Sequence, residues 1–164
     1  MIKRFLLPAM ALFFLSACAA VTTAPPRLPD NAPVTYTSTA ESCVPYARRI
    51  SGFQLYGDAY SWWDSAKPKY MCGQTPQVGA AFILARTGKM PEGHVAIVTG
   101  VTDSRHITVT HSNWGDNRGR RKVLYHAMPV EDISLNNDWT RVKFWNYEKN
   151  VYGFPYAAKG FIYK

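Results

Sequence analysis

Apolar residues are distributed differently in three parts of the chain, and each distribution predicts a different structure. Residues 5–15 form an apolar run behind Lys3 and Arg4, which is shorter than the about 20 residues that span a bilayer. Such a run is typical of an export signal, which we assign to residues 1–17. Residues 18–40 contain four prolines and no apolar periodicity, which predicts a Pro-rich linker. Residues 41–164 are long enough for one compact domain.

The domain is predicted to open with a helix. Val44, Ala47 and Ile50 recur at helical spacing, and Ser42 before them is a plausible N-cap. A proline in the first turn is compatible with this helix because the N–H groups there have no partner within the helix. The pattern therefore places Cys43 at a helix N-terminus.

Two segments rich in β-branched residues predict a β-hairpin further along the chain. They cover residues 93–101 and 106–114 and are separated by a short polar stretch. Depending on which two residues form the turn, His94 pairs with His111 or with Asn113. All three side chains share one face in either register, because His111 and Asn113 are two residues apart.

The charge of the chain restricts its partners only weakly. The formal net charge of +8 falls to +6 when residues 1–17 are removed with their two basic residues. A local basic cluster consists of Arg118, Arg120, Arg121 and Lys122. Basic surfaces attract polyanions, and for an exported protein an anionic envelope polymer or lipid is a better candidate than nucleic acid, but we expect this cluster to be a solvated charged loop.

The candidate chemistry begins at Cys43. Unpaired N–H groups and the helix dipole stabilise a thiolate, so we expect the pKa of this thiol to be lowered. A thiolate can attack an amide if an imidazole exchanges the proton and a polar third group orients that imidazole. We assign Cys43 as nucleophile, His94 as general acid/base, and either His111 or Asn113 as the orienting group. This chemistry requires no cofactor.

The end of the export signal resembles the lipobox of bacterial lipoproteins. The matching residues are Leu15-Ser16-Ala17-Cys18. The resemblance implies cleavage before Cys18 and lipid attached to it, and several acyl chains anchor a protein stably. Ala19 follows the cysteine, which favours the outer membrane if the source is Gram-negative.

Six pieces of the domain carry a second resemblance and occur in a fixed order. They are Cys43-Val44-Pro45-Tyr46-Ala47-Arg48, Gly57-Asp58-Ala59 with Trp62, Trp63 and Ala66, Pro76-Gln77-Val78-Gly79-Ala80-Ala81-Phe82, Gly93-His94-Val95-Ala96-Ile97-Val98, His111-Ser112-Asn113-Trp114 and Gly160-Phe161-Ile162. In this order they resemble the CHAP domain, the cysteine, histidine-dependent amidohydrolase/peptidase family of the papain-like NlpC/P60 group. The resemblance covers residues 41–164 and implies an α+β papain-like fold, with N-terminal helices packed on an antiparallel β-sheet. It also implies that Cys43 and His94 are the catalytic pair.

The chain departs from the family pattern at His111, where many members have Glu. A histidine accepts a hydrogen bond from His94 only as a suitable neutral tautomer, although related enzymes use one as third member. The choice between His111 and Asn113 therefore stays open.

A second cysteine in the domain, Cys72, makes a disulfide with Cys43 possible. An exported domain can oxidise its thiols, and a bridge between Cys43 and Cys72 would block the nucleophile. We place Cys72 in the loop before Pro76 and expect no obligatory bridge. Cys43 and the histidines match no recognised zinc spacing, so no metal is expected.

These features together predict a lipid-anchored, cofactor-independent cysteine amidase or endopeptidase that acts on peptidoglycan stem peptides. We expect a monomer in the cell envelope, at the periplasmic face of the outer membrane. The alternatives are a non-catalytic lipoprotein that binds peptidoglycan or a partner, and an amidase for small γ-glutamyl or polyamine amides. Which amide bond is cleaved stays open.

Overall fold

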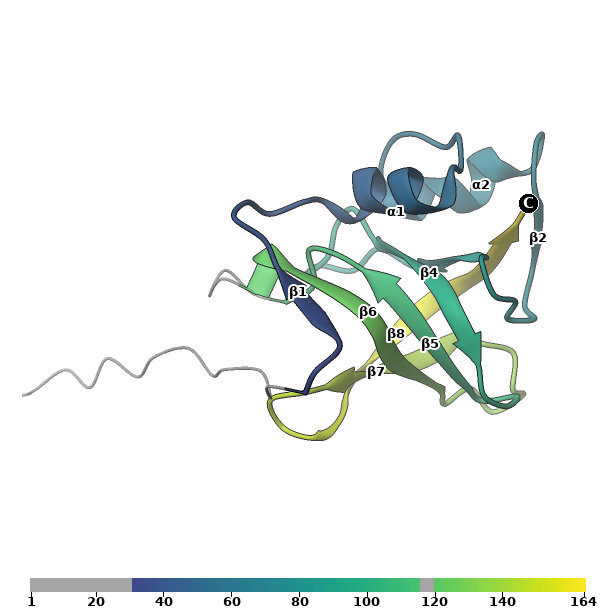
Figure 1. The fold of residues 1–164 in the computed structure, drawn as a ribbon. Helices are drawn as coiled ribbons and strands as arrows, with labels where there is room; N and C mark the ends of the chain where they lie inside the picture. Colours follow the sequence, from purple (N-terminus) through teal and green to yellow (C-terminus); the bar gives the residue numbers. More distant parts are fainter. Residues whose placement is uncertain (1–30, 116–119) are drawn as a thin grey trace, which may run out of the picture.

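The computed structural model describes residues 31–115 and 120–164 (Figure 1). Cys18, the predicted signal and Arg118 lie outside this part of the chain. The described helices are α1 (Cys43–Ser51) and α2 (Trp62–Ala66), with 3-10 turns at Ala59–Ser61 and Arg120–Lys122. The strands are β1 (Val34–Tyr36), β2 (Met71–Gly73), β3 (Ala81–Leu84), β4 (His94–Val101), β5 (His106–His111), β6 (Val123–Asp132), β7 (Arg141–Asn146) and β8 (Val151–Tyr163). The predicted α+β class is confirmed.

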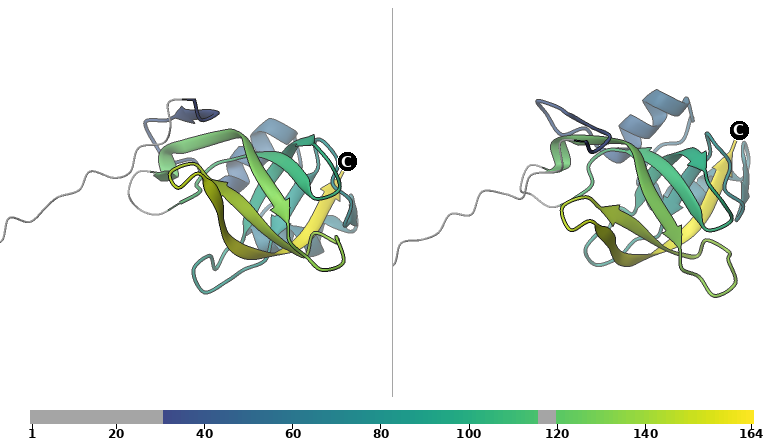
Figure 2. Two further views of the ribbon diagram at one scale, coloured as in Figure 1. Left: turned by 90° about the horizontal axis from the view of Figure 1, so that it is seen from below. Right: turned by 60° about the horizontal axis from the view of Figure 1, so that its bottom comes forward.

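The strands pair in antiparallel fashion and close on themselves. The sheet runs in the order β1-β6-β5-β4-β3-β8-β2, and β7 pairs with both β6 and β8. Strands β3 to β8 therefore form a ring, and Figure 2 shows them curving around a common interior. The sequence predicted an antiparallel sheet, and its closure into a ring is an additional feature. It arises because the long strand β8 pairs with both β3 and β7.

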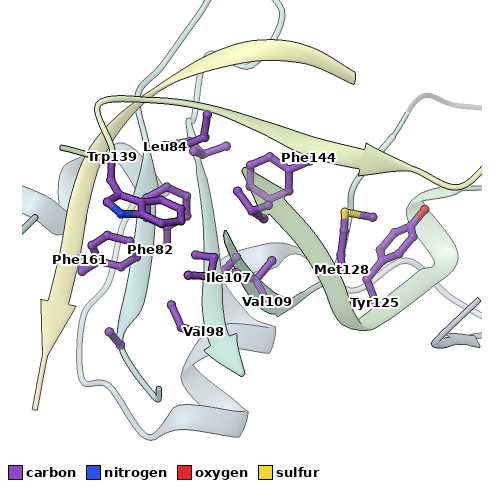
Figure 3. Packing of buried hydrophobic residues seen from close by; sticks show 14 of the residues in the cluster. Phe82, Leu84, Val98, Ile107, Val109, Tyr125, Met128, Trp139, Phe144 and Phe161 are labelled. Atoms are coloured by element: carbon purple, nitrogen blue, oxygen red, sulfur yellow. The ribbon is translucent and has the colours of Figure 1, made fainter. Parts of the chain in front are cut away.

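Alternation along the strands builds two separate apolar cores. In β3, Phe82 and Leu84 point into the ring, whereas Ala81 and Ile83 point out of it. The inward side chains pack with an aromatic cluster, in which Phe82 and Phe161 stack with ring centroids 4.6 Å apart (Figure 3). The outward side chains pack against α1 and α2, which cover one outer face of the ring (Figure 1). Helices packed on an antiparallel sheet are thus observed.

Near its turn, the hairpin formed by β4 and β5 differs from both predicted registers, but beyond Thr99 its pairing matches the predicted register that aligns His94 with Asn113. The Thr102 N–H donates to the His106 carbonyl at 2.9 Å, which leaves a three-residue turn between them instead of two. Such a turn shifts the register by one residue and would place His94 and His111 on opposite faces. A β-bulge at Thr99 restores the alignment. The two histidines therefore still share the inner face.

A buried polar contact ties α1 to the end of β5. The Thr110 hydroxyl donates to the Tyr125 carbonyl at 2.7 Å, so its hydrogen is already engaged. The Tyr46 hydroxyl, one turn after Cys43, lies 2.7 Å from the same Thr110 oxygen and must donate to it. This contact fixes the start of the helix relative to the residue beside His111.

Two segments lie elsewhere than the sequence suggested. Val34–Tyr36, within the predicted linker, pair with β6 as β1, and Thr35 Oγ1 lies 2.7 Å from His126 Nε2. Cys72 lies in strand β2, opposite Ile162, and not in a loop. Within the described residues, no helix is long and apolar enough to cross a membrane.

Candidate active site

Cys43 is the first residue of α1 and is buried. Burial raises the pKa of its thiol, and hydrogen bonds from the N–H groups of Val95 and Val44 and from the Ser42 hydroxyl only partly offset this effect. The predicted lowering of this pKa is therefore wrong for the resting protein, because loss of hydration outweighs the helix N-terminus. Ser42 precedes the helix as predicted, but its side chain makes no capping hydrogen bond.

His94 is the first residue of β4 and lies beside Cys43. The next residue, Val95, hydrogen-bonds through its backbone to the Cys43 sulfur, so the starts of α1 and β4 are in direct contact. The imidazole is 3% exposed, and this burial lowers its pKa to about 3. His94 is therefore neutral at pH 7.

His94 and His111 form a direct hydrogen bond. His94 Nε2 lies 2.9 Å from His111 Nδ1, and the two rings meet edge to face at 79°. His94 Nδ1 is thus the ring nitrogen that His111 does not engage. The predicted cluster of an imidazole with a polar neighbour from β5 is present, and His111 is that neighbour.

His111 is enclosed completely. It is 0% exposed, and its ring contacts Trp114, Tyr125 and Phe144 at centroid distances of 5.3, 5.1 and 5.6 Å. Its second nitrogen, Nε2, lies 3.2 Å from the Met128 sulfur. Burial, followed by the neighbouring His94, lowers the pKa of His111 well below its usual value. Both histidines are consequently held in their neutral forms.

Asn113 lies just beyond the end of β5 and lines the same groove as Cys43 and His94. Its φ of 54° turns the chain out of the strand direction, so Asn113 does not continue the alternation assumed for it in the sequence. The chain then places Trp114 against His94, with ring centroids 4.8 Å apart.

The site lies in an open groove with a volume of about 1660 Å³. One wall is the loop between β3 and β4, and the other is the β7–β8 hairpin. The lining includes the basic residues Lys89, Arg121 and Lys149 and the acidic residues Glu92 and Glu148, together with the exposed ring of Phe154. The groove is lined by both charged and aromatic side chains.

The thiol groups of Cys43 and Cys72 are both free. Cys72 Sγ faces the Trp63 carbonyl at 3.8 Å, on the outer side of the sheet. No group of three or more His, Cys, Asp or Glu side chains in residues 31–115 and 120–164 is arranged to hold a metal ion.

Gly93 controls the placement of His94. Its φ is +67°, and an added Cβ would lie 2.8 Å from the Leu84 carbonyl oxygen and 2.8 Å from Tyr60 Cβ. We expect Gly93→Ala to lower the free energy of unfolding by about 2 kcal/mol, through backbone strain and this collision, and to displace His94. Urea unfolding measures the effect. Gly88→Ala in the same loop meets open space and should leave stability unchanged, and an equal loss in both variants would contradict the expectation.

Sequence reasoning missed several side chains that shape the site. Ser42 was assigned to capping and instead interacts with the thiol. Met128 was not singled out, although it lines the groove and contacts His111. The alternation of apolar residues along β6 was the available signal for Met128, but pairing between β5 and β6 was needed to bring it to His111.

Comparison with known proteins identifies a family. Residues 33–113 match the family model described as the CHAP domain, and that family includes cysteine amidases and peptidases. The chain is also similar to CB1 cannabinoid receptor-interacting protein 1 from mouse and from human, 28% identical over 108 residues in each case. Each alignment covers 63% of this chain and 62% of the length of the relative, so the chain spans less than two thirds of these relatives. On the family match, residues 33–113 of this chain belong to the CHAP domain family.

Proposed function

We propose that this chain is a cysteine amidohydrolase or endopeptidase that cleaves amide bonds in the stem peptides of peptidoglycan. The observation that carries the proposal is the hydrogen bond of 2.9 Å between His94 and His111, at a groove that Cys43 also lines. A cysteine at a helix start, beside a histidine on an antiparallel strand, further supports a papain-like arrangement within the CHAP family.

The reaction begins with Cys43 and His94 both uncharged. His94 Nδ1 accepts the proton of the Cys43 thiol, and the sulfur attacks the carbonyl carbon of the amide. The Cys43 N–H donates to the developing oxyanion. His94 then protonates the departing amine, which leaves a thioester on Cys43. Water, deprotonated by His94, hydrolyses the thioester to a carboxylic acid and restores the thiol.

The pKa values of Cys43 and His94 determine at which stage of the reaction the two side chains become charged. Burial raises the pKa of Cys43 and lowers that of His94 to about 3, so the resting protein does not hold a thiolate–imidazolium pair. Transfer of the proton creates two opposite charges in a poorly hydrated site, where their attraction is strong. His94 therefore acts as a base during the reaction, and the hydrogen bond that it donates to His111 holds its ring in place.

We assign the orienting role to His111. His111→Ala should lower kcat about 100-fold, because it removes the partner of His94 Nε2. Asn113→Ala should cost less than about 10-fold, since Asn113 lines the groove without continuing the strand. Rates of peptide release by the two variants provide the comparison. A dead Asn113→Ala beside a fully active His111→Ala would transfer the role to Asn113.

The substrate class is proposed from the groove and the predicted anchor. Lys89, Arg121 and Lys149 along the groove would pair with carboxylate groups of a peptide, and Phe154 offers an apolar surface. The proposed lipid on Cys18, followed by the Pro-rich linker of residues 18–40, would hold the domain of residues 41–164 near the cell wall. We place the protein at the periplasmic face of the outer membrane, as a monomer that requires no cofactor and binds no nucleic acid.

Cys18→Ser is expected to abolish lipid attachment, because the side chain that carries the lipid is lost. The variant should accumulate as an uncleaved precursor or as a soluble periplasmic protein. Membrane fractionation and the mass of the mature N-terminus measure this. A wild-type protein that is wholly soluble, with an unmodified terminus, would contradict the anchor.

Digestion of purified peptidoglycan tests the function. Mass spectrometry of the released muropeptides should reveal new pairs of amino and carboxyl ends with the wild-type protein and none with Cys43→Ala. The positions of these ends identify the bond that is cleaved. Intact peptidoglycan combined with cleavage of small γ-glutamyl or polyamine amides would instead support the amidase for small substrates.

Binding without catalysis is the second candidate function. The raised pKa of the Cys43 thiol favours it, as does the name of the mouse and human relatives, which describes interaction with the CB1 cannabinoid receptor. A protein of this kind would cosediment with peptidoglycan or a partner and release no muropeptides. Cys43→Ala would then bind as tightly as the wild type and lose nothing measurable.

A further inference from the structure

Each ring nitrogen of His111 has a partner of a different kind. Nδ1 lies 2.9 Å from His94 Nε2, and Nε2 lies 3.2 Å from Met128 Sδ. An imidazole nitrogen can serve as either donor or acceptor, but a thioether sulfur carries no hydrogen and can only accept. The contact with Met128 is therefore a hydrogen bond only if His111 carries its proton on Nε2.

The proton on Nε2 determines the state of the other nitrogen. His111 is fully buried and neutral, and a neutral imidazole has one N–H. His111 Nδ1 is consequently a lone pair, which accepts a hydrogen bond from His94 Nε2. His94 is also neutral, so a proton on its Nε2 leaves its Nδ1 free of hydrogen. That nitrogen is the one that can take the proton of Cys43.

We propose that Met128 is a positioning residue that selects the tautomer of His111 and, through it, the tautomer of His94, a role that rests on the proposed function. The opposite arrangement fails at both ends. His111 Nδ1–H would donate to His94 and force the His94 proton onto Nδ1, where no base would face the thiol. His111 Nε2 would then direct a lone pair at the lone pairs of the Met128 sulfur.

The buried position of Met128 holds its sulfur, a weak hydrogen-bond acceptor, against His111. Met128 is 1% exposed and lies on β6 opposite Val109, and a register shift after Val109 brings the sulfur to the next inward residue of β5, His111. Figure 3 shows Met128 and Tyr125 at the opposite end of the inner core from Trp139. The titratable side chains in contact with His111 among the described residues are His94 and Tyr125. A neutral sulfur selects a tautomer without adding charge to this apolar site.

NMR of the protein with 15N-labelled histidine tests the proposal at pH 7. In the wild type, both His111 and His94 should carry the proton on Nε2. Met128→Leu keeps the volume of the side chain but removes the acceptor, so we expect a mixture of tautomers and an about 10-fold lower kcat at similar KM. Met128→Gln provides a carbonyl acceptor at similar length and should restore the Nε2–H form.

Val109→Ala is the matched control, because it removes packing opposite Met128 but leaves the sulfur in place. It should retain the wild-type tautomers. The proposal is overturned if wild-type His111 carries its proton on Nδ1, or if Met128→Leu leaves both tautomers unchanged. A proton on Nδ1 of wild-type His111 would overturn the proposal even if Met128→Leu does not fold. The spectra do not depend on turnover. If the predicted tautomers were observed in a protein that cleaves nothing, the proposed function would be refuted, but the effect of Met128 on the tautomers would stand.

Discussion

Cys43→Ala and His94→Ala should each lower the rate of peptidoglycan cleavage by about 1000-fold or more, and the double variant should be no worse than either. The two side chains act as one unit in the proposed reaction, since the thiol must lose its proton before it attacks. Once either is absent, removal of the other has nothing further to impair. Release of muropeptides at saturating peptidoglycan measures these rates.

Cys72→Ser is the matched control, because Cys72 is a free cysteine on the outer side of the sheet, facing the Trp63 carbonyl. It should retain most of the activity. An inactive Cys72→Ser beside an active Cys43→Ala would show that the nucleophile has been assigned to the wrong residue.

Mild acid should destabilise the fold. Burial lowers the pKa of His94 to about 3, whereas an unfolded histidine titrates near 6.5. Between these values the unfolded chain binds a proton that the native protein does not, so the free energy of unfolding falls as the pH falls. From pH 6.5 to 4.5, His94 alone should remove about 2 to 3 kcal/mol, at 1.36 kcal/mol for each unit of pH. His111, whose pKa is also lowered, adds to the loss.

Urea unfolding at pH 7.0 and 4.5 measures this loss of stability. Hydrogen bonds lower the pKa values of the Asp103 and Asp138 carboxyl groups, so these groups also destabilise the fold as the pH falls, and the share of the histidines is the part that disappears when they are replaced. Replacement of both buried histidines by glutamine should remove most of the dependence on pH. The same slope in that double variant and in the wild type would contradict the account.

Local features of the site could be predicted from the sequence. The spacing of Val44 and Ala47 correctly placed Cys43 at the start of a helix, and the β-branched segments correctly placed His94 and His111 in neighbouring strands. These predictions hold because helix starts and strand alternation depend on residues close together in the chain. The β-bulge at Thr99 carries no such local signal, and without it the two histidines would have been separated.

Tertiary burial accounts for what the sequence did not reveal. The pKa of Cys43 was expected to fall and instead rises, because the loss of hydration depends on how α1 packs against β4. The closed ring depends on pairing of β7 with β6 and β8. The match to the CHAP family ends at residue 113, yet Met128 and Phe144, which enclose His111, lie beyond it. The later strands thus complete the site that the earlier ones begin.

The central claim is that the Cys43 sulfur performs the cleavage, and stoichiometric alkylation tests it most directly. A halomethyl ketone built on a stem peptide would occupy the groove and react with the thiol there. Intact-mass measurement and peptide mapping give the fraction of Cys43 labelled, and muropeptide release gives the remaining activity. We predict that activity falls in proportion to one label on Cys43 per chain, while Cys72 stays unlabelled. Peptidoglycan cleavage that persists with Cys43 fully labelled would contradict the account.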